Sequence, residues 1–199
     1  MRRLTIAIVA MTTLLSSCGA DESGLIGYVP AFDKDVSRVV VGEVSDSTTK
    51  PFAFKAATNE VLVVYFGYTN CPDLCPTTLY AVKSAKKKIG EDLAARVDLA
   101  MVTVDPERDT SEKLPKYLAS FSDRFHAIVP TTDSELRAAE DAFQVTSSVT
   151  KQTDGTIEVA HSATAYVVDD TGRVVVEWPF GLDADAMAND LRFVLSDEA

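Results

Sequence analysis

Apolar residues in this chain fall into short runs, some with the spacing of strands and some with the spacing of helices. Residues 61–66 form a continuous β-branched and aromatic run followed by a glycine, which is typical of a central strand covered on both faces. Residues 97–104 and 127–129 predict two further strands. Residues 39–54 and 163–178 each predict two strands joined by a polar turn.

Helical spacing separates these strands. Apolar residues recur every three or four positions from residue 76 to 89, from 110 to 121 and from 183 to 195. Thr132 and Glu135 have the spacing of a capping box and predict a fourth helix start. The alternation predicts an α/β domain with a central sheet flanked by helices and preceded by a β-hairpin.

Composition excludes several classes of protein. The chain has 199 residues, is 46% hydrophobic and 25% charged, and carries a net charge of -11. These values are typical of a globular protein with one core. An acidic chain lacks the basic face that nucleic-acid binding requires, so no nucleic-acid partner is expected.

The N-terminal residues resemble a bacterial lipoprotein signal. Arg2 and Arg3 precede an uncharged apolar stretch over residues 4–15, and Leu-Ser-Ser-Cys ends at Cys18. The resemblance implies that Cys18 becomes the lipidated first residue of the mature protein; an ordinary secretory signal cut nearby is the alternative.

These features divide the chain into three parts. Residues 1–17 are predicted to be the signal peptide. Residues 18–38 are predicted to be a lipidated tether, because they are polar and lack periodicity. Residues 39–199 then form the domain. This places the protein on the extracytoplasmic face of a bacterial membrane, on the periplasmic or cell-envelope side.

Two cysteines remain once Cys18 carries lipid. Cys71 and Cys75 follow the predicted central strand, where open α/β sheets place their ligands. A disulfide closing so short a loop stabilises little, so the pair indicates redox or metal chemistry. Pro76 predicts a helix start with Cys75 at the cap, and the positive helix end is then expected to lower the thiol pKa values.

The spacing leaves both uses open. Residues four apart on a helix hold their Cβ atoms about 5–6 Å apart, whereas a disulfide needs about 3.5–4.5 Å. Two thiolates on one soft metal ion tolerate the wider separation. The neighbouring prolines make the segment irregular, so a redox-active Cys71–Cys75 pair stays possible after a small movement.

A third ligand is expected from one of two histidines. His126 lies at the edge of a short strand and is interpreted as structural. His161 precedes the predicted strand at 163–168, where a thioredoxin carries a cis-proline against its disulfide; this chain has no proline between residues 131 and 178. Two thiolates and an imidazole suit Cu(I), and weaker added ligands would accommodate Cu(II). Structural zinc prefers four protein ligands.

Four segments together resemble the SCO/SenC family of copper-binding, thioredoxin-like proteins. They are Tyr-Phe-Gly-Tyr-Thr at residues 65–69, Cys-Pro-Asp-Leu-Cys-Pro at 71–76, Val-Asp-Pro-Glu-Arg-Asp-Thr at 104–110 and His-Ser at 161–162. The resemblance implies a thioredoxin-like fold with a mixed sheet, and copper bound by Cys71, Cys75 and His161. Asp73, Asp105 and Asp109 are further polar candidates, as direct ligands or as supports of the ligands.

The resemblance also implies a function. It implies a membrane-anchored chaperone that delivers copper to the dinuclear copper site of cytochrome c oxidase and is not an enzyme. The expected partners are the copper-site subunit of the oxidase and other copper carriers or thiol reductants. The alternative is a thiol–disulfide oxidoreductase that keeps the oxidase cysteines reduced. A peroxiredoxin-like peroxidase is disfavoured, because the sequence offers no convincing arginine partner.

Overall fold

The computed structural model describes residues 24–45 and 48–196. Seven strands form the main sheet: β1 (Val40–Ser45), β2 (Thr48–Ala53), β3 (Val61–Gly67), β4 (Val97–Thr103), β5 (Phe125–Ile128), β8 (Ala165–Val168) and β9 (Val174–Trp178). Their spatial order is β2-β1-β5-β4-β3-β8-β9. β3, β4 and β5 are mutually parallel, and the remaining pairs are antiparallel. The sheet is therefore mixed, as predicted.

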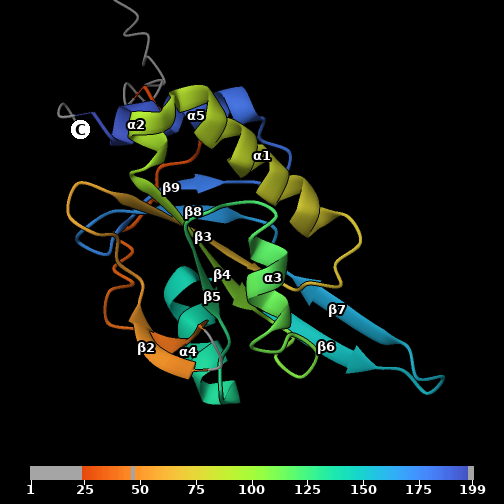
Figure 1. The fold of residues 1–199 in the computed structure, drawn as a ribbon. Coiled ribbons are helices and arrows are strands. Elements are labelled where there is room, and N and C mark those ends of the chain that lie inside the picture. The colour runs from red at the N-terminus through yellow and green to blue at the C-terminus, as the bar shows by residue number, and fades with distance from the viewer. Residues whose placement is uncertain (1–23, 46–47, 197–199) are drawn as a thin grey trace, which may run out of the picture.

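Helices cover both faces of this sheet (Figure 1). They are α1 (Leu74–Ile89), α2 (Glu91–Ala94), α3 (Lys113–Leu118), α4 (Asp133–Phe143) and α5 (Ala184–Val194). One core joins Leu79 of α1, Leu114 of α3 and Leu191 of α5. The opposite core contains Phe143 of α4. The prediction of an α/β sheet flanked by helices is confirmed.

The apolar run in β3 explains why this strand is central. All seven residues of β3 are buried. Val63 and Tyr65 belong to the core on the α1 side, whereas Val64 and Phe66 belong to the core on the α4 side. Successive side chains of a strand point to opposite faces, so a continuous apolar run supplies both cores.

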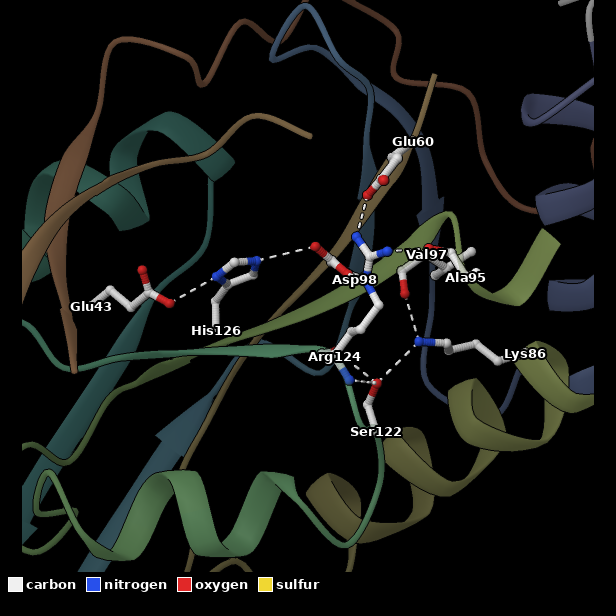
Figure 2. A network of polar contacts seen from close by, with 9 residues as sticks. All are labelled: Glu43, Glu60, Lys86, Ala95, Val97, Asp98, Ser122, Arg124 and His126. Atoms are coloured by element: carbon white, nitrogen blue, oxygen red, sulfur yellow. Dashed lines mark hydrogen bonds and ion pairs between the residues drawn. The ribbon is translucent and has the colours of Figure 1, made fainter. Parts of the chain in front are cut away.

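Polar side chains connect the N-terminal hairpin to the parallel strands. β1 pairs with β5 at a single position, Glu43 with Ile128. His126 lies between the carboxylates of Glu43 and Asp98, at 2.8 Å and 3.3 Å, and Arg124 pairs with Asp98 and Glu60 (Figure 2). This network therefore supplements a short backbone pairing.

The structure contains one hairpin that the hydrophobic pattern does not predict. β6 (Ser147–Lys151) and β7 (Ile157–His161) form a separate two-stranded antiparallel sheet. β6 is polar and largely exposed. β7 alternates, with Ile157 and Val159 half-buried, but so short an alternation beside a polar strand is a weak signal in a sequence.

Residues 24–38, predicted as part of a tether, lie against the domain. Val36 is fully buried, and Tyr28 forms a backbone bridge with Glu177 of β9. This part of the segment is apolar rather than polar, and Leu25 and Val36 pack against the two cores. Cys18 and the rest of the predicted tether lie outside the described residues. Within residues 24–45 and 48–196, no helix has the length and apolar character needed to cross a membrane.

Candidate metal centre

The end of β3 and the start of α1 position the two cysteines. Cys71 lies in the connecting loop, and Cys75 lies in the first turn of α1. Both thiols are free and buried, and the backbone N–H of Cys75 donates to the Cys71 sulfur over 3.4 Å. A Cβ at Gly67 would lie 2.8 Å from the Cys75 sulfur. Glycine at this position therefore lets the strand end close to the thiol.

The unpredicted hairpin brings the third donor. His161 is the last residue of β7, and its Nε2 lies 3.6 Å from Cys75 Sγ and 4.0 Å from Cys71 Sγ. The three donor atoms all lie within 4.8 Å of one another. Among the described residues, this is the one group of three or more histidine, cysteine or acidic side chains spaced to share an ion.

Contacts around His161 fix the orientation of its ring. Nδ1 lies 2.9 Å from the carbonyl oxygen of Ser162 and donates to it. In the neutral ring this leaves the lone pair on Nε2, the nitrogen that faces the sulfurs. Tyr65 and Tyr68 pack edge-to-face against the ring, with centroids 6.1 Å and 5.7 Å away. The imidazole is thus oriented as a metal ligand.

The pKa of the Cys75 thiol differs from the prediction for a thiol at the N-terminus of a helix. Burial raises the pKa of Cys75 to about 12. The expected lowering is therefore wrong for this residue. α1 begins at Leu74, so Cys75 lies inside the first turn and is fully buried rather than at the cap. The free-energy cost of removing the thiolate from water exceeds its stabilisation by the helix N-terminus. A bound cation would supply the positive charge that stabilises the thiolate.

Asp109 holds the cysteine loop in place. Its buried carboxylate accepts hydrogen bonds from the backbone N–H of Thr69 at 2.9 Å, from the Thr69 hydroxyl and from the Thr103 hydroxyl at 2.7 Å. Lys113 lies 3.7 Å from the same carboxylate. Asp109 therefore connects the end of β4 to the loop that carries Cys71.

The other polar candidates lie apart from the donor group. Asp105 is buried and pairs with Arg108, and burial raises its pKa. Asp73 is exposed and accepts from the Thr77 hydroxyl over 3.2 Å. His126 faces Glu43 and Asp98, as its structural interpretation requires. Among the described residues, neither these three side chains nor Asp109 joins the shared donor group.

The donor set fits a soft metal ion. Two sulfurs and one imidazole nitrogen match the preference of Cu(I), and three donors fall short of the four that structural zinc prefers. The sequence pointed to Cys71, Cys75 and His161. It singled out the segment that contains Tyr65, Gly67 and Tyr68 through the family resemblance, but it assigned no role to these three residues.

Comparison with known proteins identifies relatives with this fold. The sequence model of the SCO1/SenC family matches residues 43–196. An SCO2-like protein of Rickettsia prowazekii is 26% identical over 187 residues, which cover 92% of this chain and 88% of the relative.

Two solved structures are similar as well. ScoI of Bradyrhizobium japonicum with copper bound is 27% identical, with a TM-score of 0.65 over 77% of this chain and 96% of that chain. Apo Sco1 of Thermus thermophilus is 29% identical, with a TM-score of 0.66 over 85% of this chain and 94% of that chain.

Proposed function

The chain belongs to the SCO1/SenC family, and from this premise we propose that it is a copper chaperone for cytochrome c oxidase. It binds copper through Cys71, Cys75 and His161 and delivers the ion to the dinuclear copper site during assembly of the oxidase. The observation that carries the proposal is the approach of two thiols and an oriented imidazole to within 4.8 Å of one another.

Copper is the cargo in this proposal, and the chain's own residues set how it is held. The two sulfurs supply soft, negatively charged donors, and binding releases their protons. Cys75 is fully buried, whereas His161 is only half-buried. An incoming ligand of the partner therefore reaches the ion from the His161 side, and the imidazole is the first donor to exchange.

The N-terminal sequence supports a location at the membrane. Residues 1–17 serve as the signal, and Cys18 carries lipid. Residues 39–199 contain the copper-binding domain, and residues 24–38 pack against it. The lipid holds the protein on the extracytoplasmic face of the membrane. There it meets the copper-site subunit of the oxidase, and copper carriers or thiol reductants that reload it.

Substitution of the single ligand histidine tests this function. The reduced full chain should bind one equivalent of Cu(I), and His161→Ala should weaken that binding strongly. His126→Ala is the matched control, because His126 is the only other histidine and contacts carboxylates instead of thiols. Equal affinities in His161→Ala and His126→Ala would remove the imidazole from the site and contradict the proposal.

A thiol–disulfide oxidoreductase is the second candidate, and the proximity of two free thiols favours it. In this reaction Cys71 and Cys75 each lose one electron and one proton and form a disulfide, while a disulfide of the oxidase subunit becomes two thiols. The reaction needs no imidazole ligand. Full rescue of an oxidase-assembly defect by His161→Ala would favour the reductase, whereas failure of His161→Ala and success of His126→Ala would favour copper delivery.

A further inference from the structure

Residues 24–35, here called the N-terminal strap, run beside the outer edge of β9 (Figure 1). Tyr28 and Glu177 exchange two backbone hydrogen bonds of 2.9 Å and 2.8 Å. Further along, the N–H of Val174 donates to the carbonyl of Lys34 over 3.0 Å. The strap therefore pairs with the edge strand of the sheet, which would otherwise expose unpaired backbone groups.

Side chains of the domain also hold the strap. The fully buried carboxylate of Asp190 accepts from the backbone N–H groups of Ile26 and Gly27, at 2.7 Å and 2.8 Å. The ammonium of Lys34 pairs with Glu177 at 2.6 Å. The backbone of the strap is thus fixed to α5 and β9, and its outward side chains occupy defined positions.

Those outward side chains are apolar. Of the nine large hydrophobic side chains that are exposed in the described residues, four lie within the seven residues from 26 to 32. Tyr28 is 68% exposed and Phe32 79% exposed, and Ile26 and Val29 accompany them. A concentration of exposed apolar side chains on a fixed segment indicates a contact surface.

The sequence position of this surface identifies what covers it. Gly24 lies six positions after Cys18, and even a fully extended chain of that length spans only about 20 Å. A lipid on Cys18 would hold the start of the strap, at Gly24, within that distance of the membrane. The exposed apolar side chains of the strap then lie near a bilayer that can cover them.

We propose that the N-terminal strap is a membrane-contacting surface: Ile26, Tyr28, Val29 and Phe32 insert into the interface of the bilayer that carries the Cys18 lipid. This inference rests on the lipid anchor of the proposed function and adds an orientation to it. The net charge of -11 offers no attraction to anionic headgroups, so the contact is apolar. Tyrosine suits the headgroup boundary, and phenylalanine suits the apolar region just below it.

The orientation has a consequence for the metal centre. A hollow beside the strap is lined by Phe32 from the strap and by Ser162 and Thr164 from the loop that follows His161. When the strap rests on the bilayer, the loop next to the ligand imidazole stays close to the membrane plane.

Tryptophan quenching in lipid vesicles tests the proposal. The full chain, processed in a bacterial host, is reconstituted into phosphatidylcholine vesicles with brominated acyl chains. Phe32→Trp places an indole on the strap, and Val149→Trp places one at a matched exposed apolar position on the β6–β7 hairpin. The native Trp178 is fully buried and gives a constant background. Phe32→Trp should lose the larger part of its added emission, and Val149→Trp should lose none.

Flotation of the same vesicles separates the strap from the anchor. A chain that floats without quenching in Phe32→Trp keeps its lipid and overturns the strap contact alone. Equal quenching in both variants would show that no face of the domain is preferentially turned toward the bilayer, and this result also overturns the strap contact. An emission shift that depends on protein concentration and not on bromine would mean that a second copy covers the strap. A chain that does not float overturns the anchor, and the strap contact with it.

Discussion

At the scale of single residues, the centre depends on groups that keep two buried sulfurs and one imidazole in place. Cys75 has no access to water, and burial raises its thiol pKa to about 12. A metal ion therefore competes with a tightly held proton at this sulfur, and copper affinity should rise with pH. The positions of the donors matter more than their reactivity, and Asp109 is the residue that holds the Cys71 loop.

Replacement of Asp109 by alanine should weaken both folding and copper binding. The change leaves the N–H of Thr69 and the hydroxyl of Thr103 without their acceptor, and each unpaired buried group costs about 1–3 kcal/mol of unfolding free energy. Urea unfolding and Cu(I) competition measure the two effects. Asp73→Ala is the control: its carboxylate is exposed, and we expect a change within about 0.5 kcal/mol. Equal losses in both variants would deny Asp109 this role.

At the scale of elements, the β6–β7 hairpin is the part of the site that sequence reasoning missed. The position of His161 near the thiols was predicted from a resemblance and from a missing proline. The hairpin that carries it was not predicted, because β6 is polar and β7 has only a short alternation of half-buried residues. By contrast, β3 and the capped start of α4 were predicted, because an apolar run and the Thr132–Glu135 pair encode them locally. Long-range pairing of an exposed hairpin has no such local code.

The start of α1 shows a second limit of local patterns. Pro76 was expected to be the first helical residue, yet the helix begins at Leu74. Proline is tolerated anywhere in the first turn, because the N–H groups there lack helical partners. A shift of two residues moved Cys75 from the cap into the core, and this shift reversed the expected direction of its pKa.

The network around His126 gives the sheet a pH-dependent connection. Burial lowers the pKa of His126. Hydrogen bonds to Asp98 and Glu43 raise the pKa by more than burial lowers it, so the net pKa lies above the ordinary 6.5. Burial likewise raises the pKa of Asp98, while His126 and Arg124 lower it to about 2. Figure 2 shows the imidazole between the two carboxylates. The centroid of the Phe52 ring lies 4.7 Å from the centroid of the imidazole. The charged imidazole thus links β1 to β4.

The sign of the pH dependence follows from the raised pKa of His126. Its contribution to the free energy of unfolding is fully present below pH 6.5 and is lost as the pH rises through the folded-state pKa. His126→Gln cannot titrate and should show a smaller loss over that range. Urea unfolding at pH values on either side of 6.5 measures the difference. If the unfolding free energies of the wild type and His126→Gln change equally with pH, His126 does not control the pH dependence of stability.

At the scale of the whole molecule, the N-terminal strap joins the sheet edge, α5 and the surroundings of the metal centre. Asp190 is the connecting residue, because its carboxylate accepts from the strap and from the indole N–H of Trp178 at 2.9 Å. The domain therefore includes the N-terminal strap in addition to the predicted sheet, and buried side chains of the domain hold the strap in place.

Asp190→Asn should loosen the strap while the metal centre stays intact. The amide offers one acceptor oxygen where the carboxylate offered two, so donors remain unpaired, at a cost of about 1–3 kcal/mol for each buried group. Hydrogen exchange at Ile26 and Gly27 should accelerate, and Cu(I) affinity should not change. Asp185→Asn is the control on the same helix, since its side chain is 82% exposed. Unchanged exchange at Ile26 and Gly27 in Asp190→Asn would contradict the role given to Asp190.

X-ray absorption at the copper edge tests the shared centre most directly. The reduced full chain, loaded with one Cu(I), is predicted to give two sulfur scatterers and one imidazole nitrogen, and His161→Ala is predicted to lose the nitrogen shell. A nitrogen shell that persists in His161→Ala, or a wild-type spectrum without nitrogen, would contradict the account.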